Sequence, residues 1–195
     1  EVSLNTLWAA PHGLSLTANA FWRQRISDSV TSNSPFASIT PSQGLSLRAG
    51  HTHTLDALQH TLVTGMDLLD EKASTGTRTS TYSESNKASY GLYAEETLRF
   101  WDRCSVIVGA RFDQARFVEA IQFPSFTGTL RFQGWSPKVG FSVEVLEPVT
   151  LYANFARPFK APNVDDFSAA VPTGFFGNTD LEPQQAYDYE IGGHV

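Results

Sequence analysis

The sequence has a single cysteine, Cys104, and a single methionine among its 195 residues. One cysteine cannot form an intramolecular disulfide, and no second cysteine is present to build a zinc site. No apolar run approaches the roughly 18 residues that a transmembrane helix needs. The 14 basic residues are outnumbered by 20 acidic ones and form no cluster of the kind that neutralises phosphates. These absences exclude helical membrane spans and argue against nucleic-acid binding.

The two ends of the sequence also lack the marks of natural termini. It begins at Glu1 with no methionine, basic segment or apolar leader, and it stops at Val195 within an alternating pattern. We therefore expect residues 1–195 to be one contiguous piece of a longer chain, with the signal peptide absent or removed.

What the sequence has is alternation of apolar and polar residues along its whole length. From Leu14 to Trp22 the even positions are apolar, and the same holds from Val106 to Phe112, where Arg111 falls on the opposite face. A period of two predicts strands whose two faces meet different environments. Nine segments carry it, near residues 2–10, 14–26, 44–54, 60–70, 88–100, 104–118, 130–146, 149–157 and 185–195.

The lengths of these segments and of their connections favour a transmembrane β-barrel. A strand of about 12 residues, tilted by about 45°, covers about 28 Å, close to the hydrocarbon thickness of a bilayer. Tight turns at 11–13, 56–59, 101–103 and 147–148 alternate with long polar loops around 27–43, 71–87, 119–129 and 158–184. Short periplasmic turns and long outer loops are the layout of bacterial barrels. Aromatic residues near the segment ends fit the two membrane interfaces: Trp8, Trp22, Tyr90, Phe100, Trp101, Trp135 and Phe155.

The alternation assigns residues to faces, because successive side chains of a strand point in opposite directions. A lipid-facing Arg or Lys would cost about 2 to 4 kcal/mol at the bilayer midplane, so the apolar phase should face lipid. We expect an outward direction for Val108, Ala110, Phe112, Val139, Phe141, Leu151 and Phe155. We expect the concave side for Arg111, Asp113, Lys138 and Glu144.

The C-terminal part carries several motifs in a fixed order. Leu151–Asn163 is a strand pattern that ends in an aromatic residue, a basic residue, Ala and Pro; after a loop come Gly177–Pro183 and Tyr187–Gly192. Upstream lie Tyr90–Glu96, Gly109–Asp113 and Trp135–Gly140. Together these motifs resemble the barrel of TonB-dependent receptors, the outer-membrane importers of ferric siderophores, haem, cobalamin and some sugars. The sequence departs from the family pattern at Thr179 and Gln184, where Pro and Glu are usual.

The resemblance implies an all-β, antiparallel, up-and-down barrel of twenty-two strands in the bacterial outer membrane, of which residues 1–195 would form about nine. It also implies a receptor that binds a scarce ligand and imports it when the energy-coupling protein TonB pulls on an N-terminal plug domain, which nothing in this sequence matches. Haem-type members carry a His in the region of residues 163–177, which have none, so a ferric siderophore or similar chelate is favoured. Outer-membrane lipid and lipopolysaccharide are further expected partners, and no cofactor is expected.

Two groups of residues are candidate functional sites. Residues of the last long loop could contact ligand, since loops on rigid scaffolds carry function: Arg157, Phe159, Lys160, Phe175, Phe176 and Asp180. Charged residues of the concave side could face a plug or line a ligand path: Arg48, Asp67, Arg99, Arg111, Asp113 and Glu190. The alternatives are a purely structural loop for the first group and mutual pairing with solvation for the second.

Other interpretations have less support. His51 and His53 share a strand face, but metal binding needs further ligands, so placement at the membrane interface is favoured. Asp70 and Glu71 are expected to open a long polar loop. A barrel enzyme is disfavoured because no nucleophile signature is present, and no catalytic residue is assigned. A soluble β-sandwich would not predict loops of alternating length.

Overall fold

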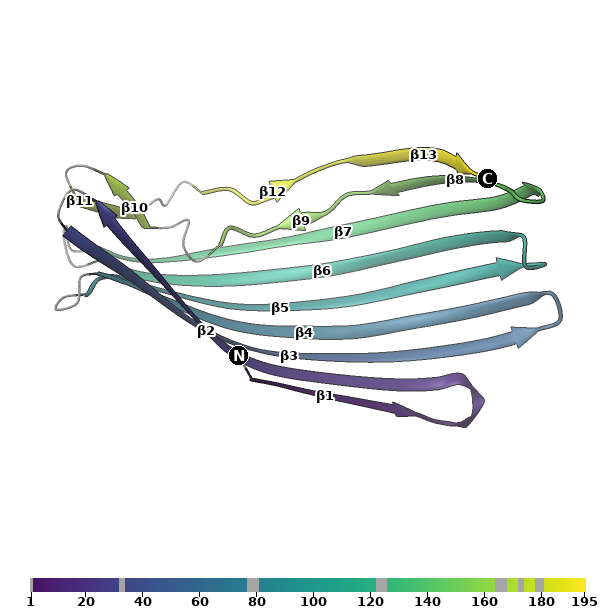
Figure 1. Cartoon of the computed structure of the whole chain (residues 1–195), viewed down its shortest axis with the longest axis horizontal. Helices are drawn as coiled ribbons and strands as arrows, with labels where there is room; N and C mark the ends of the chain where they lie inside the picture. The colour runs from purple at the N-terminus through teal and green to yellow at the C-terminus, as the bar shows by residue number, and fades with distance from the viewer. Residues whose placement is uncertain are drawn as a thin grey trace.

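The computed structural model describes residues 2–31, 34–76, 81–121, 126–163, 168–171, 174–177 and 181–195. Its main element is one antiparallel sheet of nine strands that follow each other in chain order, with β1 and β13 at the two edges (Figure 1). The strands are β1 (Val2–Ala9), β2 (Leu14–Thr31), β3 (Ser34–Leu55), β4 (Leu58–Gly76), β5 (Thr81–Phe100), β6 (Cys104–Ile121), β7 (Phe126–Leu146), β8 (Val149–Ala156) and β13 (Asp188–His194). The predicted up-and-down order is confirmed. None of the described residues belongs to a helix long and apolar enough to cross a membrane.

Tight turns join the strands at one end of the sheet, on the right of Figure 1. The β1–β2 turn is the short 3₁₀ segment η1 (Pro11–Gly13), in which Gly13 has φ +75° and lies against the carbonyl of Thr52, where a side chain would not fit. Asp56, Trp101 and Asp102 also have positive φ in the turns after β3 and β5. The described ends of the other hairpins lie at the opposite end, called here the long-loop end.

The strands are longer than the alternation predicts, and most of the expected loops at 27–43, 71–87 and 119–129 are paired strand. β2 and β3, for example, stay in register up to the pair Thr31 and Ser34. In these stretches many of the positions are Ser, Thr and other polar residues, so the apolar–polar pattern weakens although the backbone ladder continues. The β3–β4 ladder skips Thr40 and Pro41, as expected where proline lacks an N–H.

Among the described residues, the last long connection is the one that leaves the nine-stranded sheet for many residues. It contains β9 (Phe159–Lys160), which pairs with β12 (Gln184–Gln185), and β10 (Ser168–Val171), which pairs with β11 (Gly174–Gly177). It starts at the end of β8 opposite the Glu147–Pro148 turn. The prediction that this connection and that turn lie at opposite ends of the sheet is therefore confirmed.

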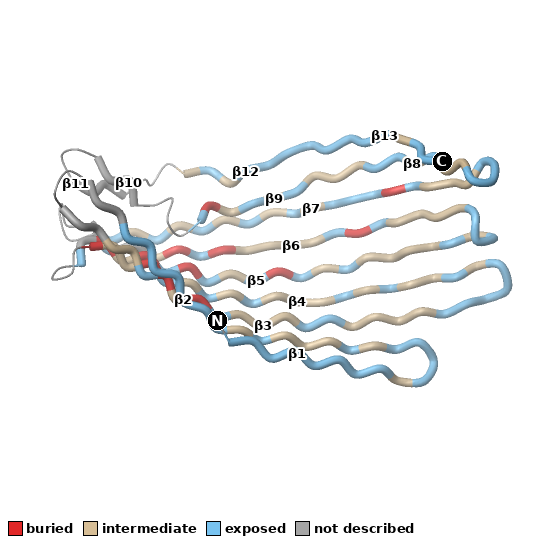
Figure 2. The backbone as a smooth tube through the Cα atoms, viewed as in Figure 1, coloured by how far each residue is buried: buried red, intermediate tan, exposed pale blue. Residues whose placement is uncertain are grey.

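The two faces of the sheet separate as the alternation predicts. Val108, Val139 and Phe155 lie on one rung of the ladder, whereas Arg111 pairs with Ser136 on the other phase. The buried side chains of the strands all share the phase of Arg111: Thr40, Ser42, Ala73, Ser83, Ser85, Lys87, Ala115 and Phe117. Because side chains converge on the inside of a curved sheet, this is the concave face, and the opposite one is the outer face. Figure 2 shows the buried positions on the middle strands, mostly toward the long-loop end.

The apolar band of the outer face slants across the strands. It ends at Trp22 on β2, at Phe112 on β6 and at Trp135 on β7. Trp22 shares a rung with Arg116, so the margin has shifted by four residues between β2 and β6. A shift of about 13 Å along the strands over about 19 Å across them corresponds to a tilt of about 35°. Tilted barrel strands cut by a flat membrane produce such a margin.

Candidate functional site

The centre of the concave face carries an ionic group around Arg111. Its Nε donates to both carboxylate oxygens of Asp113, at 2.8 and 2.9 Å, and its Nη1 lies 2.5 Å from Asp67 Oδ2. The guanidinium also stacks over the ring of Tyr93, 5.6 Å from its centroid. Gly91 lies between the two aspartates on one rung, and a Cβ there would collide with the guanidinium. Glycine at this position therefore lets one cation bridge carboxylates from β4 and β6.

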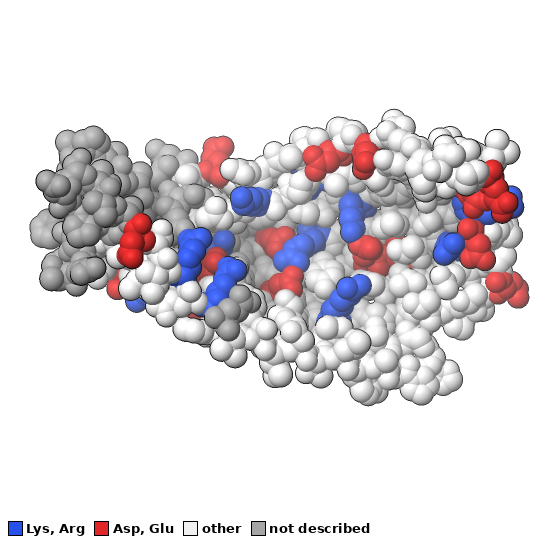
Figure 3. Space-filling view, in the orientation of Figure 1, with Lys and Arg blue, Asp and Glu red and all other residues white. Residues whose placement is uncertain are grey.

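Further ion pairs extend this polar surface along the sheet, and Figure 3 shows the charged groups gathered in the hollow of the concave face. Lys138 on β7 pairs with Glu95 on β5. Nearer the long-loop end, Glu71 lies 3.5 Å from Lys87 Nζ and 3.6 Å from Arg23. The central part encloses an open hollow of about 510 Å³, whose charged lining residues are Arg48, Asp67, Glu95, Arg111 and Lys138.

The six concave-face candidates are therefore only partly assembled. Asp67, Arg111 and Asp113 contact one another, and Arg48 lines the same hollow with no ion pair among the described residues. Arg99 lies apart, 3.4 Å from Asp102 beside a tight turn. Glu190, on β13, accepts hydrogen bonds from two β8 side chains, Tyr152 Oη at 3.1 Å and Asn154 Nδ2 at 3.3 Å. Glu95 and Tyr93 are functional candidates that sequence reasoning missed, although both share the phase of Arg111.

The ligand candidates after β8 play different parts. Arg157 fastens the base of the long connection, because its Nη2 donates to Gln185 Oε1 at 2.6 Å and its guanidinium stacks on Tyr187 at 5.4 Å. Phe159 donates its N–H to Ser136 Oγ at 2.9 Å. Its ring occupies the space above Gly134 on the concave face, where a side chain would collide with it. Lys160 pairs with Gln184 through its backbone, and its exposed side chain makes no ion pair or hydrogen bond with the described residues.

An apolar cluster on the concave face receives both ends of the long connection. Phe117 is 2 % exposed and Ala115 3 %, and partly buried residues pack against them: Leu130, Phe132, Ala161 and Leu181. Ala161 belongs to the motif after β8 and Leu181 to the motif before β13. The two motifs therefore come together over the concave face. Asp180 and the side chains of Phe175 and Phe176 lie outside the described residues.

The outer face holds a histidine group near the tight turns. His60 on β4 stands beside His51 and His53 on β3, with ring centroids 5.6 to 6.3 Å apart within the group. His60 Nδ1 lies 3.4 Å from Glu96 Oε1 on β5. Within the described part of the chain, no three His, Cys, Asp or Glu residues are arranged to hold a metal ion.

The expected role of Asp70 and Glu71 at the start of a loop is wrong. Both lie inside β4, which runs on to Gly76. They point to opposite faces, Glu71 to the concave face and Asp70 to the outer one, because neighbours in a strand alternate.

Comparison with known proteins supplies the family and the fold. The family described as TonB dependent receptor-like, beta-barrel, matches residues 1–193. The ferric citrate transporter FecA in its unliganded form has a TM-score of 0.75 at 15 % identity, over 98 % of this chain and 31 % of that one. The alcaligin outer membrane receptor FauA from Bordetella pertussis has a TM-score of 0.76 at 16 % identity, over 98 % of this chain and 32 % of that one. The siderophore receptor PiuA from Acinetobacter baumannii has a TM-score of 0.75 at 10 % identity, over 98 % of this chain and 36 % of that one.

These relatives share a fold at low sequence identity, and the chain spans about a third of their length. No curated protein matches it in sequence. The named relatives and the matching family are receptors and transporters, not enzymes.

Proposed function

Because the chain belongs to the TonB dependent receptor-like β-barrel family, we propose that it is part of the wall of an outer-membrane receptor that actively imports a scarce ligand. One observation carries the proposal most strongly: a single curved sheet has an apolar outer face and a concave face lined by paired charges. That division suits a wall between lipid and a polar interior. In the intact receptor, further strands would close the barrel and remove the two open edges of β1 and β13.

The ligand that we propose is a ferric siderophore or a similar anionic metal chelate. FecA, FauA and PiuA are named for ferric citrate, alcaligin and siderophores, which supports this class. In this chain, Lys160 offers an exposed cation at the long-loop end. Neighbouring strand residues point in opposite directions, so Lys160 points away from the wall against which Phe159 packs. A positive group in that place would attract an anionic chelate.

The concave-face hollow would meet the plug domain of the intact receptor. Its cations and carboxylates are already paired with each other, apart from Arg48. A plug that contacts a paired surface leaves no unpaired charge behind when it moves, which suits a part that TonB must displace. Arg48 would then be the cation most available for a plug carboxylate.

The ligand proposal is tested by binding and uptake with the intact receptor in the outer membrane. The Lys160→Ala variant is compared with Lys72→Ala, which removes a cation from the outer face at the same end. The probes are ferric citrate, a ferric hydroxamate and a ferric catecholate. We expect Lys160→Ala to weaken binding of one probe by about tenfold, equivalent to about 1.4 kcal/mol, while Lys72→Ala leaves it unchanged.

Equal binding by both variants would show that Lys160 does not contact the ligand. Uptake that continues without TonB would contradict active import and indicate passive diffusion through a pore.

A further inference from the structure

Two arginines of the outer face stand directly opposite each other at the long-loop end. Arg116 on β6 is the ladder partner of Arg131 on β7, and both are exposed. Neither guanidinium has a hydrogen bond or ion pair among the described residues. Like charges directly opposite on a ladder destabilise a sheet, so the pair is unfavourable unless an anion lies between them.

The height of the pair relative to the apolar band indicates where such an anion would lie. The continuous apolar band of the outer face ends at Phe112 on β6 and at Trp135 on β7, and Gln114 and Gln133 form the next rung. The arginines lie one rung further, about 13 Å along the strands from the band. Arginine side chains reach back toward the bilayer while keeping the charge at the headgroup level.

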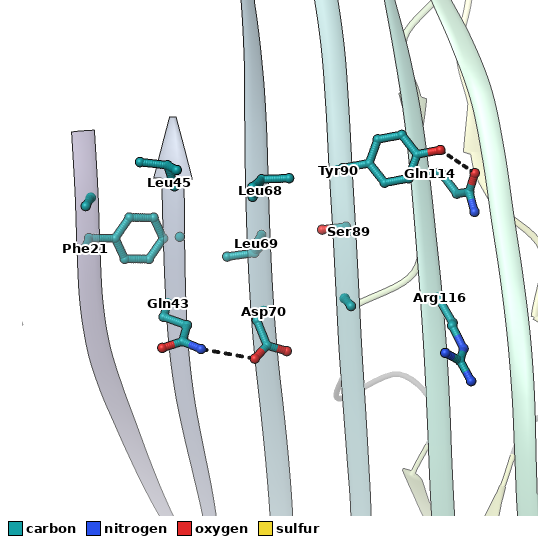
Figure 4. A pocket seen from close by; sticks show the side chains of 13 residues that line it. Phe21, Gln43, Leu45, Leu68, Leu69, Asp70, Ser89, Tyr90, Gln114 and Arg116 are labelled. Atoms are coloured by element: carbon teal, nitrogen blue, oxygen red, sulfur yellow. Dashed lines mark hydrogen bonds between the residues drawn. The ribbon is translucent and has the colours of Figure 1, made fainter. Parts of the chain in front are cut away.

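An open hollow of about 720 Å³ lies beside Arg116 on the outer face (Figure 4). Its side toward the band is formed by Leu45, Leu68 and Tyr90. Tyr90 donates to Gln114 Oε1 on the same rung at 2.7 Å. The next rung of the outer face is polar, where Gln43 donates to Asp70 at 3.2 Å. The hollow therefore spans the margin between apolar and polar surface and suits an amphipathic molecule.

We propose that Arg116 and Arg131 bind a phosphate of lipopolysaccharide, with an acyl chain of the same molecule lying against Leu45, Leu68 and Tyr90. The proposal rests on the proposed function, which puts the long-loop end in the outer leaflet. Two guanidiniums on adjacent strands can share one phosphate through charge-assisted hydrogen bonds, and the phosphate removes their mutual repulsion. Lysine in the same places would act as a point charge without this paired geometry.

The test uses the intact receptor purified in detergent, with folding checked by heat-modifiable gel mobility. Binding is measured for three probes: lipopolysaccharide, the same lipopolysaccharide after removal of its phosphates, and phosphatidylglycerol. The Arg116→Gln, Arg131→Gln double variant is compared with Lys72→Gln, which removes an outer-face cation that already pairs with Glu84 at 3.5 Å. We expect the double variant to lose affinity for lipopolysaccharide by about tenfold or more and the control to keep it.

Wild-type affinity in the double variant, or full binding of dephosphorylated lipopolysaccharide, would overturn the proposal. Equally tight binding of phosphatidylglycerol would overturn the choice of lipopolysaccharide. The proposed function fails separately, if the wild-type protein is not recovered in the outer membrane or takes up none of the ferric chelates.

Discussion

The two halves of β6 and β7 are opposite in polarity although they belong to the same ladder. Toward the tight turns, the outer face of β6 is apolar from Val106 to Phe112, and the concave face carries Arg111. Toward the long-loop end, the apolar residues move to the concave face, with Phe117 buried there, while Arg116 is exposed on the outer face. β7 repeats the inversion between Trp135 and Phe132.

This inversion shows that the surroundings, and not the backbone pairing, decide which phase is apolar. In the proposed receptor, lipid would cover the outer face of the half toward the tight turns, called here the lower half, and a polar interior would cover its concave face. In the half toward the long-loop end, called here the upper half, the two ends of the long connection pack on the concave face through Ala161 and Leu181, and water or headgroups would cover the outer face. The change of phase within one strand would then mark the margin of the membrane.

The largest effect is expected in the upper half, from Phe117→Ala. Removing a buried phenylalanine costs about 3 to 5 kcal/mol, and here it removes the surface that holds Ala161 and Leu181. We expect much faster hydrogen exchange and proteolysis at residues 158–163 and 181–187 of the intact receptor. Phe112→Ala is the matched control, since it makes the same change on the opposite face of the same strand, where lipid would fill the space in the proposed receptor. Equal effects of the two substitutions would show that the halves do not differ in packing.

The next effect concerns the lower half. Val108→Arg puts a charge near the centre of the apolar band and should cost about 2 to 4 kcal/mol of stability in a bilayer. Ile107→Arg, one residue away, points to the concave face and should cost much less. The measurement is denaturant unfolding of the intact receptor in lipid vesicles. A larger loss for Ile107→Arg would mean that the faces are assigned the wrong way round.

A smaller effect is expected from the paired charges of the concave face. Arg111→Met leaves Asp67 and Asp113 without their shared cation, and because the group is about one-third exposed the cost should be only about 1 to 2 kcal/mol. Adding Asp67→Asn and Asp113→Asn should restore most of the lost stability, since no unpaired carboxylate then remains. If the triple variant is less stable than Arg111→Met alone, the carboxylates are held by contacts other than Arg111.

Alternation alone was enough to predict the order of the strands and the faces of residues such as Val108 and Arg111. It could not predict how far the hairpins extend, because Ser- and Thr-rich strands beyond the band have no apolar phase. Ser27 and Ser38, for example, are partners within a region expected to be a loop. Alternation also could not predict the ion-pair partners of Arg111, because Asp67 is 44 residues away in the sequence and only the strand register brings it close. The inversion beyond Phe112 is visible in the sequence, although the alternation over 104–118 predicts only one continuous strand.

The smallest effect concerns Glu96. It is an acidic residue on the outer face of the lower half, where the other residues of the band are mostly apolar. It lies two rungs from the tight-turn margin defined by Phe100, and His60 Nδ1 is 3.4 Å from its carboxylate. Acidic residues near a membrane interface cost less than Arg or Lys at the midplane, about 0 to 1 kcal/mol, and the imidazole reduces even that. If the lower half owes its outer face to lipid, then Glu96→Leu should leave the stability in vesicles unchanged or raise it by up to about 1 kcal/mol. In an amphipol, which keeps the protein in solution without a bilayer, the same substitution should have no consistent effect on stability. His60→Ala should be slightly unfavourable in vesicles only while Glu96 is present, and neutral in the Glu96→Leu background, because its one polar contact is then gone. A clear loss of stability with Glu96→Leu would instead mean that this carboxylate faces a polar partner and that the apolar band of β5 is interrupted at the histidine group.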